Sequence, residues 1–76
     1  MPPKKSPANR RLGKAIRMLR AEQGLTQEAF ALKAGVDRSY YGAIERGEFN
    51  VTIDTLMRIA SGLGMPAAEI MQRAGL

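Results

Sequence analysis

The sequence contains neither cysteine nor histidine among its 76 residues. Without cysteine it has no disulfide framework and no cysteine-based zinc site, and without histidine it lacks the usual imidazole base and metal ligand. It also lacks a glycine-rich phosphate loop and a pair of carboxylates at a catalytic spacing. These absences argue against an enzyme and predict no metal, no cofactor and no small-molecule ligand.

Long apolar runs are absent as well. Residues 1–11, "MPPKKSPANRR", do not have the apolar stretch of a signal peptide, and nothing later approaches the roughly 20 apolar residues of a membrane span. We therefore expect a soluble, cytoplasmic protein with no membrane partner. A chain this short forms one domain and buries only about 60% of the surface that its unfolded chain exposes, so almost every apolar residue is needed in the core.

Acidic residues are missing from the first 20 positions, which hold seven lysines and arginines. Residues 21–76 hold five basic and seven acidic side chains, so the net charge of +5 comes from one end of the chain. Such an excess predicts a polyanionic partner, with nucleic acid as the first candidate and an acidic membrane surface as the second.

The spacing of apolar residues and capping residues predicts an all-α fold. Residues 1–7, with three prolines and two lysines, are interpreted as a disordered basic arm, and residues 8–76 as the folded domain. Helices are expected over residues 8–23 and 27–34, over a third segment capped by Asp37 and ended by Gly47, over a fourth capped by Thr52 and ended by Gly64, and over a fifth from Met65 to about Arg73. A compact bundle of five short helices follows, and a generic bundle without a ligand explains this pattern equally well.

The connection between the second and third helices separates these interpretations. Two short helices joined by a tight turn over residues 34–37 have the proportions of a helix-turn-helix, whose second helix enters the major groove of DNA. The segment "LTQEAFALKAGVDRSYYGAIERGEFNVTIDTLMRIASGLGM" resembles the Cro and phage-repressor type of helix-turn-helix regulator, the XRE family, with Ala31, Gly35 and the "IERG" ending in register. The resemblance covers about residues 10–72 and implies a lambda-repressor-like domain that binds double-stranded DNA.

Within this family, "VDRSY", "IERG" and "NVTIDTL" are similar to the small controller proteins that time restriction-modification genes. Related stretches occur in other small bacterial and phage repressors. The resemblance implies a transcriptional regulator that binds an inverted-repeat operator as a homodimer. A second interpretation is an antitoxin-type or phage-type repressor whose helical domain also binds a protein partner.

On a helical wheel, the third helix has one polar or small side made of Arg38, Ser39, Gly42, Ala43 and Arg46. Small residues let the helix axis approach base edges, and an arginine in the first turn can make a bidentate contact with guanine. We expect base readout from this side, with Arg38 contributing most. The alternative is that Arg38 is a solvated surface charge.

Contacts with DNA phosphates are expected from residues around this helix. Gln27 and Thr52 open helices, where unpaired backbone amides favour an anion, and Thr52 also serves as an N-cap. The resemblance implies a phosphate or base contact for the first of these. The remaining candidates are the hydroxyl of Tyr40 and three polar or basic side chains: Asn50, Lys14 and Arg17.

Three further expectations concern packing. Glu45 opposes the dipole of its helix, and the resemblance implies that it pairs with Arg20, whereas Tyr41 should be largely core with its hydroxyl at the edge. Apolar side chains beyond the needs of five short helices predict a homodimer face, with core filling as the alternative. The residues expected in that face are Met57, Leu63, Met65, Ile70 and Met71.

Overall fold

Four of the helices begin at a residue whose side-chain oxygen accepts a hydrogen bond from a backbone N–H three residues later. Ser6, Thr26, Asp37 and Thr52 are these N-caps, and each cap distance is 3.1 Å. Each cap pairs one of the amides that a helix start leaves without a partner. Local chemistry of this kind explains why the predicted helix starts lie close to the observed ones.

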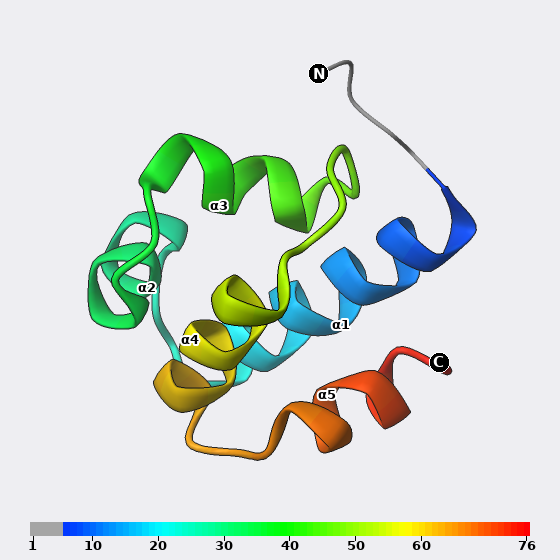
Figure 1. Cartoon of the computed structure of the whole chain (residues 1–76). Helices are drawn as coiled ribbons and strands as arrows, with labels where there is room; N and C mark the ends of the chain where they lie inside the picture. Colours follow the sequence, from blue (N-terminus) through cyan, green and yellow to red (C-terminus); the bar gives the residue numbers. More distant parts are fainter. Residues whose placement is uncertain (1–5) are drawn as a thin grey trace.

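The computed structural model describes residues 6–76, and within that range the regular structure is entirely helical (Figure 1). The predicted all-α, five-helix fold is confirmed, with ends shifted by one or two residues from those expected. The elements in chain order are α1 (Pro7–Glu22), α2 (Gln27–Ala34), α3 (Arg38–Glu45), α4 (Ile53–Leu63) and α5 (Ala67–Arg73).

The basic arm predicted over residues 1–7 lies mostly outside the described residues. Its last two residues belong to the fold, because Ser6 caps α1 and Pro7 is its first residue. Proline is well suited to this position, since its missing N–H is one of those that a helix start cannot pair. Helix α1 therefore begins one residue earlier than the sequence pattern indicated, with its cap at Ser6.

The turn between α2 and α3 is closed by Gly35, whose φ of 71° lies in the left-handed region. Its N–H donates to the carbonyl of Leu32, and the N–H of Val36 donates to that of Ala31. A side chain is disfavoured at such a φ, so glycine permits this sharp change of direction. The turn sets α3 across α2 and leaves one side of α3 on the outside of the molecule (Figure 1).

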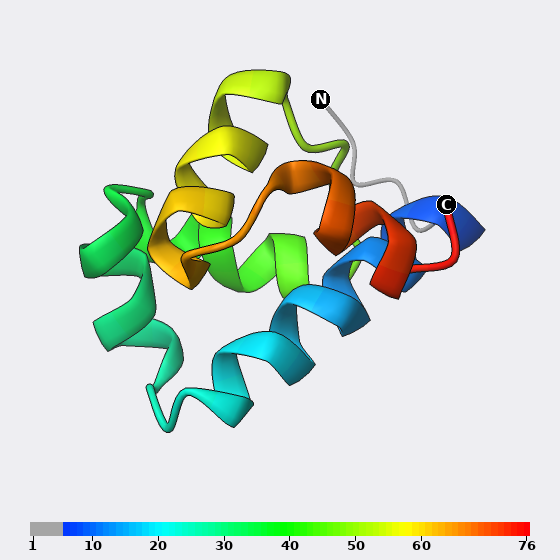
Figure 2. The same cartoon turned by 90° about the horizontal axis from the view of Figure 1, so that it is seen from below.

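All five helices contribute to one core. Phe30, Tyr41, Ile16, Ile44, Ile59 and Ile70 are the largest fully buried side chains. Helix α1 packs against both α3 and α5, and Figure 1 shows it between them, whereas in the view of Figure 2 it forms one edge of the bundle. No helix in the described range is both long enough and apolar enough to span a membrane.

Close approach of α1 to α3 depends on Gly13. A Cβ built on this residue would lie 2.3 Å from the carbonyl oxygen of Ile44 and 2.6 Å from that of Glu45. Both atoms belong to the backbone, so they cannot move aside as a flexible side chain would. Because residue 13 has no side chain, the C-terminal end of α3 can pack directly against the middle of α1. This contact holds α3 against the rest of the bundle.

Two residues predicted in a dimer face are instead part of the core. Leu63 is 5% exposed and Ile70 is fully buried, because α4 and α5 close over α1 within the same chain. Met65 and Met71 are partly buried and pack against this core, and Met57 is 56% exposed. The prediction of an interface at Leu63 and Ile70 is therefore wrong, since neither side chain has surface left to offer a second copy.

Candidate nucleic-acid interface

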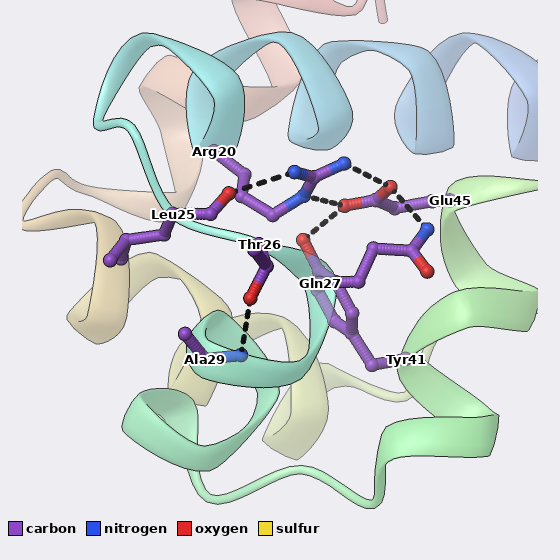
Figure 3. Close-up of polar contacts among 7 residues, drawn as sticks. All are labelled: Arg20, Leu25, Thr26, Gln27, Ala29, Tyr41 and Glu45. Carbon is purple, nitrogen blue, oxygen red and sulfur yellow. Dashed lines mark hydrogen bonds and ion pairs between the residues drawn. The ribbon is translucent and has the colours of Figure 1, made fainter.

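The carboxylate of Glu45 is the centre of a polar cluster that joins the first three helices (Figure 3). Arg20 of α1 donates to it from Nε at 2.7 Å and from Nη2 at 3.0 Å, and Gln27 of α2 donates from Nε2 at 2.8 Å. The hydroxyl of Tyr41 is a further donor from α3 itself. Arg20 also donates from Nη1 to the carbonyl of Leu25, so one guanidinium ties down the loop before α2.

Protonation of Glu45 is set by two opposed effects. Burial by itself raises the pKa of a carboxyl group, but the hydrogen bonds from Arg20, Tyr41 and Gln27 stabilise the charged form and outweigh burial. The pKa of Glu45 is therefore lowered, and the hydrogen bond to Glu45 likewise raises the pKa of Arg20. The structure thus brings together the two residues expected to pair, and it keeps both charged.

Tyr41 occupies the core side of α3, where it is fully buried. Its ring packs against Phe30 with a centroid separation of 5.3 Å, and its hydroxyl reaches the edge of the core at Glu45. Burial, followed by the nearby carboxylate, raises the pKa of Tyr41 above its ordinary value. The phenol therefore remains a hydrogen-bond donor to Glu45.

On the opposite side of α3, four residues line a hollow of about 330 Å³ together with Gln27 of α2. These residues are Arg38, Ser39, Gly42 and Arg46. Because the amide nitrogen of Gln27 is held by Glu45, its Oε1 lies toward Gly42, 3.7 Å from where a Cβ of that residue would be. The polar cluster therefore orients one wall of the hollow.

Both arginines of this hollow have an acidic neighbour. Arg38 Nη1 lies 2.9 Å from Glu28 Oε2, and Arg46 Nε lies 3.1 Å from Glu48 Oε2. The first pair is exposed on both sides, with 72% and 68% of the two side chains accessible. Exposed ion pairs of this kind are weak, so a stronger anion can replace the acids. Neither of these two ion pairs was expected from the sequence; for the first, no helical spacing links Glu28 to Arg38.

The structure places Ala43 differently from the other residues of this side. Ala43 is 4% exposed, and its carbonyl accepts a hydrogen bond from the N–H of Glu48 where the chain turns back after α3. The predicted base contact at Ala43 is therefore wrong. Gly42, one residue earlier, is the small residue that lines the hollow.

The candidates before and at the start of α4 form a second exposed group. Thr52 caps α4, and the side chain of Asn50 accepts a hydrogen bond from Asn9 Nδ2 at 2.9 Å. Tyr40 is partly buried, packs edge-on against Phe49 with centroids 6.3 Å apart, and points its hydroxyl at the carbonyl of Asn50 at 3.4 Å. Tyr40 therefore borders both the core and the exposed surface.

The two basic candidates on α1 are exposed and lie three residues apart, so they are neighbours on the helix surface. Lys14 lines a groove between α1 and α5, on the side of α1 away from α3. The structure does not bring Lys14 to the hollow beside α3.

The hydrogen bonds that Gln27 and Tyr41 donate to Glu45 were not predicted from the sequence. The four-residue spacing of Tyr41 and Glu45 on one helix was a usable signal for the second of them.

Comparison with known proteins finds the same fold in regulators. Residues 16–70 match the helix-turn-helix family HTH_3. The chain is 41% identical over 61 residues to control protein C.MunI of Mycoplasma sp., covering 79% of this chain and 82% of that protein. The structure of this chain is similar to that of the restriction-modification controller protein C.AhdI from Aeromonas hydrophila, with a TM-score of 0.79 and 37% identity. The match covers 82% of this chain and 94% of that protein. The clp gene regulator ClgR from C. glutamicum gives a TM-score of 0.86 at 28% identity, with coverage of 95% and 92%.

Proposed function

The chain belongs to the helix-turn-helix family HTH_3 and is a non-enzymatic DNA-binding transcriptional regulator, and we propose that it is a restriction-modification controller protein that binds an inverted-repeat operator as a homodimer. The observation that carries this proposal is the exposed side of α3, where two arginines, a serine and a glycine line one hollow with Gln27. This is the side of the helix that the turn after α2 leaves open to a partner.

The length of this side suits a short segment of DNA. Arg38 and Arg46 are eight residues apart on the helix and its cap, which corresponds to about 12 Å at a helical rise of ~1.5 Å per residue. That length spans roughly three to four base pairs, at ~3.4 Å per pair. Each guanidinium can donate two hydrogen bonds to a guanine, and Ser39 can contact either kind of base.

The surrounding residues are proposed to contact phosphates. Gln27 and Thr52 lie at the starts of α2 and α4, where the positive end of each helix dipole attracts an anion. Asn50 and the hydroxyl of Tyr40 lie beside Thr52, and Arg17 of α1 adds positive charge without base recognition. These contacts would fix the position of α3 in the groove, which a base-reading helix requires.

A homodimer is proposed because one domain reads only a few base pairs. The structure offers Ile53 and Met57, which are 76% and 56% exposed and lie one turn apart on α4. Met65 and Met71, which follow α4 in the chain, are partly buried and pack against the core. The proposed dimer face therefore uses Met57 with Ile53, in place of the buried Leu63 and Ile70.

The test of the proposal is selection of bound DNA from a random pool with the full chain. An inverted repeat is expected, and its occurrence upstream of restriction-modification genes would support the controller role. Arg38→Ala should weaken binding to the selected site more than to a mismatched site, with about 1 to 3 kcal/mol lost on the selected one. Arg73→Ala, on α5 and away from the hollow, serves as the control.

Two results would overturn parts of this proposal. Recovery of no enriched sequence would reject specific DNA readout, and an equal loss on both sites for Arg38→Ala would reduce that residue to a phosphate contact. For the dimer, sedimentation at tens of micromolar should show a dimer that Met57→Glu weakens. Met18→Glu, a methionine of similar exposure on α1, should leave the dimer unchanged; a monomer in both forms would reject the dimer.

A further inference from the structure

A second hollow, of about 350 Å³, lies between α1 and α5. Its floor is apolar and is made by Ala15, Met18 and Ala74, and Met18 is 54% exposed. An exposed methionine offers a flexible, polarisable surface that adapts to different apolar partners. This groove between α1 and α5 is not needed for the readout of DNA proposed above.

Three basic residues surround the apolar floor: Arg11 and Lys14 from α1 and Arg73 from α5. Arg73 forms an ion pair with Glu69, with 3.5 Å between Nη2 and Oε2. Arg11 and Lys14 form no ion pair within the described residues. The groove therefore combines an apolar contact surface with two cations that pair with no carboxylate of residues 6–76. That combination is complementary to a chain that carries both apolar and acidic side chains.

The groove is separate from the candidate nucleic-acid interface. Helix α1 lies between α3 and α5 (Figure 1), and the hollow beside α3 shares no lining residue with this groove. It is also distinct from Ile53 and Met57 of the proposed dimer face, which lie on α4. A molecule bound in the groove would therefore leave both other surfaces free.

We propose that this groove docks an acidic, amphipathic peptide segment of a partner protein, in a way that is compatible with bound DNA. The partner's apolar side chains would contact mainly Met18, above a floor closed by the two buried alanines, and its carboxylates would pair with Arg11 and Lys14. A nucleic-acid backbone is the less suitable occupant, because phosphates would use the cations but not the apolar floor. The proposal goes beyond operator binding, since it gives the regulator a contact with a third component.

The test uses a synthetic helical peptide with leucines along one face and glutamates elsewhere. The isotope-labelled full chain is titrated with this peptide, free and bound to its selected DNA, and backbone amide chemical shifts are followed. Shifts confined to α1 and α5, present in both titrations, are expected. The matched peptide with lysine in place of glutamate should not bind.

Variants separate the two parts of the groove. Met18→Glu and the double change Arg11→Glu with Lys14→Glu should each weaken the peptide about tenfold. Leu32→Glu, a change at an apolar residue of α2 that is 84% exposed, should leave peptide binding unchanged, and Arg11→Lys with Lys14→Arg should retain it. Urea unfolding of each variant shows whether it is folded, so a loss of binding in a folded variant is attributable to the groove.

Three outcomes would overturn the proposal. Shifts centred on α3 in the free chain, together with release of DNA by the peptide, would mean that the peptide only imitates a nucleic acid. A loss of DNA affinity in the Arg11→Glu and Lys14→Glu variant equal to its loss of peptide affinity would assign the groove to the DNA backbone. Absence of shifts at α1 and α5 in a folded free chain would reject the groove as a peptide site, whatever the result of the DNA selection.

Discussion

Arg20 and Glu45 form a two-point ion pair, at 2.7 and 3.0 Å, that joins α1 to the C-terminal end of α3 across 25 residues of the chain. Glu45 is almost entirely buried, with 2% of its side chain exposed, and 14% of the Arg20 side chain is exposed. A carboxylate in that position is stable only while its donors are in place. The pair therefore both holds α3 against α1 and orients Gln27 beside the exposed side of α3.

Loss of the arginine alone should be costly. Arg20→Met would leave a buried carboxylate without its cation, and we expect the free energy of unfolding in urea to fall by about 3 kcal/mol. Arg20→Met with Glu45→Gln should recover part of that loss, giving a coupling well above 1 kcal/mol in the double-mutant cycle. Arg73→Met, which removes the exposed partner of Glu69, should cost less than about 1 kcal/mol. Additive single changes at Arg20 and Glu45 would contradict the structural role of the pair.

The free energy of unfolding should fall at acid pH because Glu45 becomes protonated. Its pKa in the folded chain is lowered from the ordinary value of 4.5, so the unfolded chain takes up the proton first as pH falls. The contribution of Glu45 is therefore complete above pH 4.5 and is lost as pH falls through the lower folded pKa. Urea unfolding at a series of acid pH values checks this, with Glu69→Gln as the control. A carboxyl NMR titration that places the pKa of Glu45 at or above the ordinary value would contradict it.

The two adjacent tyrosines should respond differently to loss of the hydroxyl. Tyr41→Phe keeps the ring against Phe30 but removes a donor to the Glu45 carboxylate, so we expect about 1.5 kcal/mol of lost stability. Tyr40→Phe removes an exposed and longer hydrogen bond, at 3.4 Å, and should change stability by less than about 0.5 kcal/mol. Thermal and urea unfolding compare the two, and equal losses would mean that the Tyr41 hydroxyl does not stabilise Glu45.

Two glycine-to-alanine changes in helices should have opposite effects on folding. Gly13→Ala sets a Cβ within 2.6 Å of two backbone oxygens, so α1 and α3 must separate, and we expect a loss of about 2 to 3 kcal/mol. A Cβ added at Gly42 would have the flexible end of Arg46, Nη1, as its nearest neighbour at 3.2 Å, so Gly42→Ala should gain about 0.5 kcal/mol from helix propensity. The same Gly42→Ala change narrows the hollow beside α3 and should weaken DNA binding. Urea unfolding and DNA titration of both variants measure this, and a stable Gly13→Ala chain would show that the helices can adjust.

Removal of the acid beside Arg38 should strengthen DNA binding. Glu28→Gln leaves Arg38 without its ion pair and removes a negative charge from the start of α2, so affinity should rise several-fold on matched and mismatched DNA alike. Stability should change little, since both side chains of the pair are exposed. Glu69→Gln is the control, because its arginine partner lies on α5. Fluorescence anisotropy at several salt concentrations measures the effect, and unchanged affinity would show that Glu28 does not compete with DNA.

Helix positions and the helix-turn-helix could be read from the sequence because their causes are local. Thr26, Asp37 and Thr52 each pair an amide only three residues away, and Gly35 ends α2 through its own φ. A short stretch of sequence contains all the atoms of such an interaction. The polar or small side of α3 was visible for the same reason, since it follows from helical periodicity alone.

Tertiary structure decided what each helix face meets. Ala43, Leu63 and Ile70 were assigned to external surfaces, but all three are buried in the folded chain, the last two where α4 and α5 close over α1. The same packing directs Lys14 toward α5 and brings Glu28 to Arg38. Burial and charge pairing depend on distances between segments that are far apart in sequence, and those distances are set only when the helices pack. The sequence could indicate that Glu45 needs a cation. Only the packing of the helices brings Arg20, Gln27 and Tyr41 together around its carboxylate.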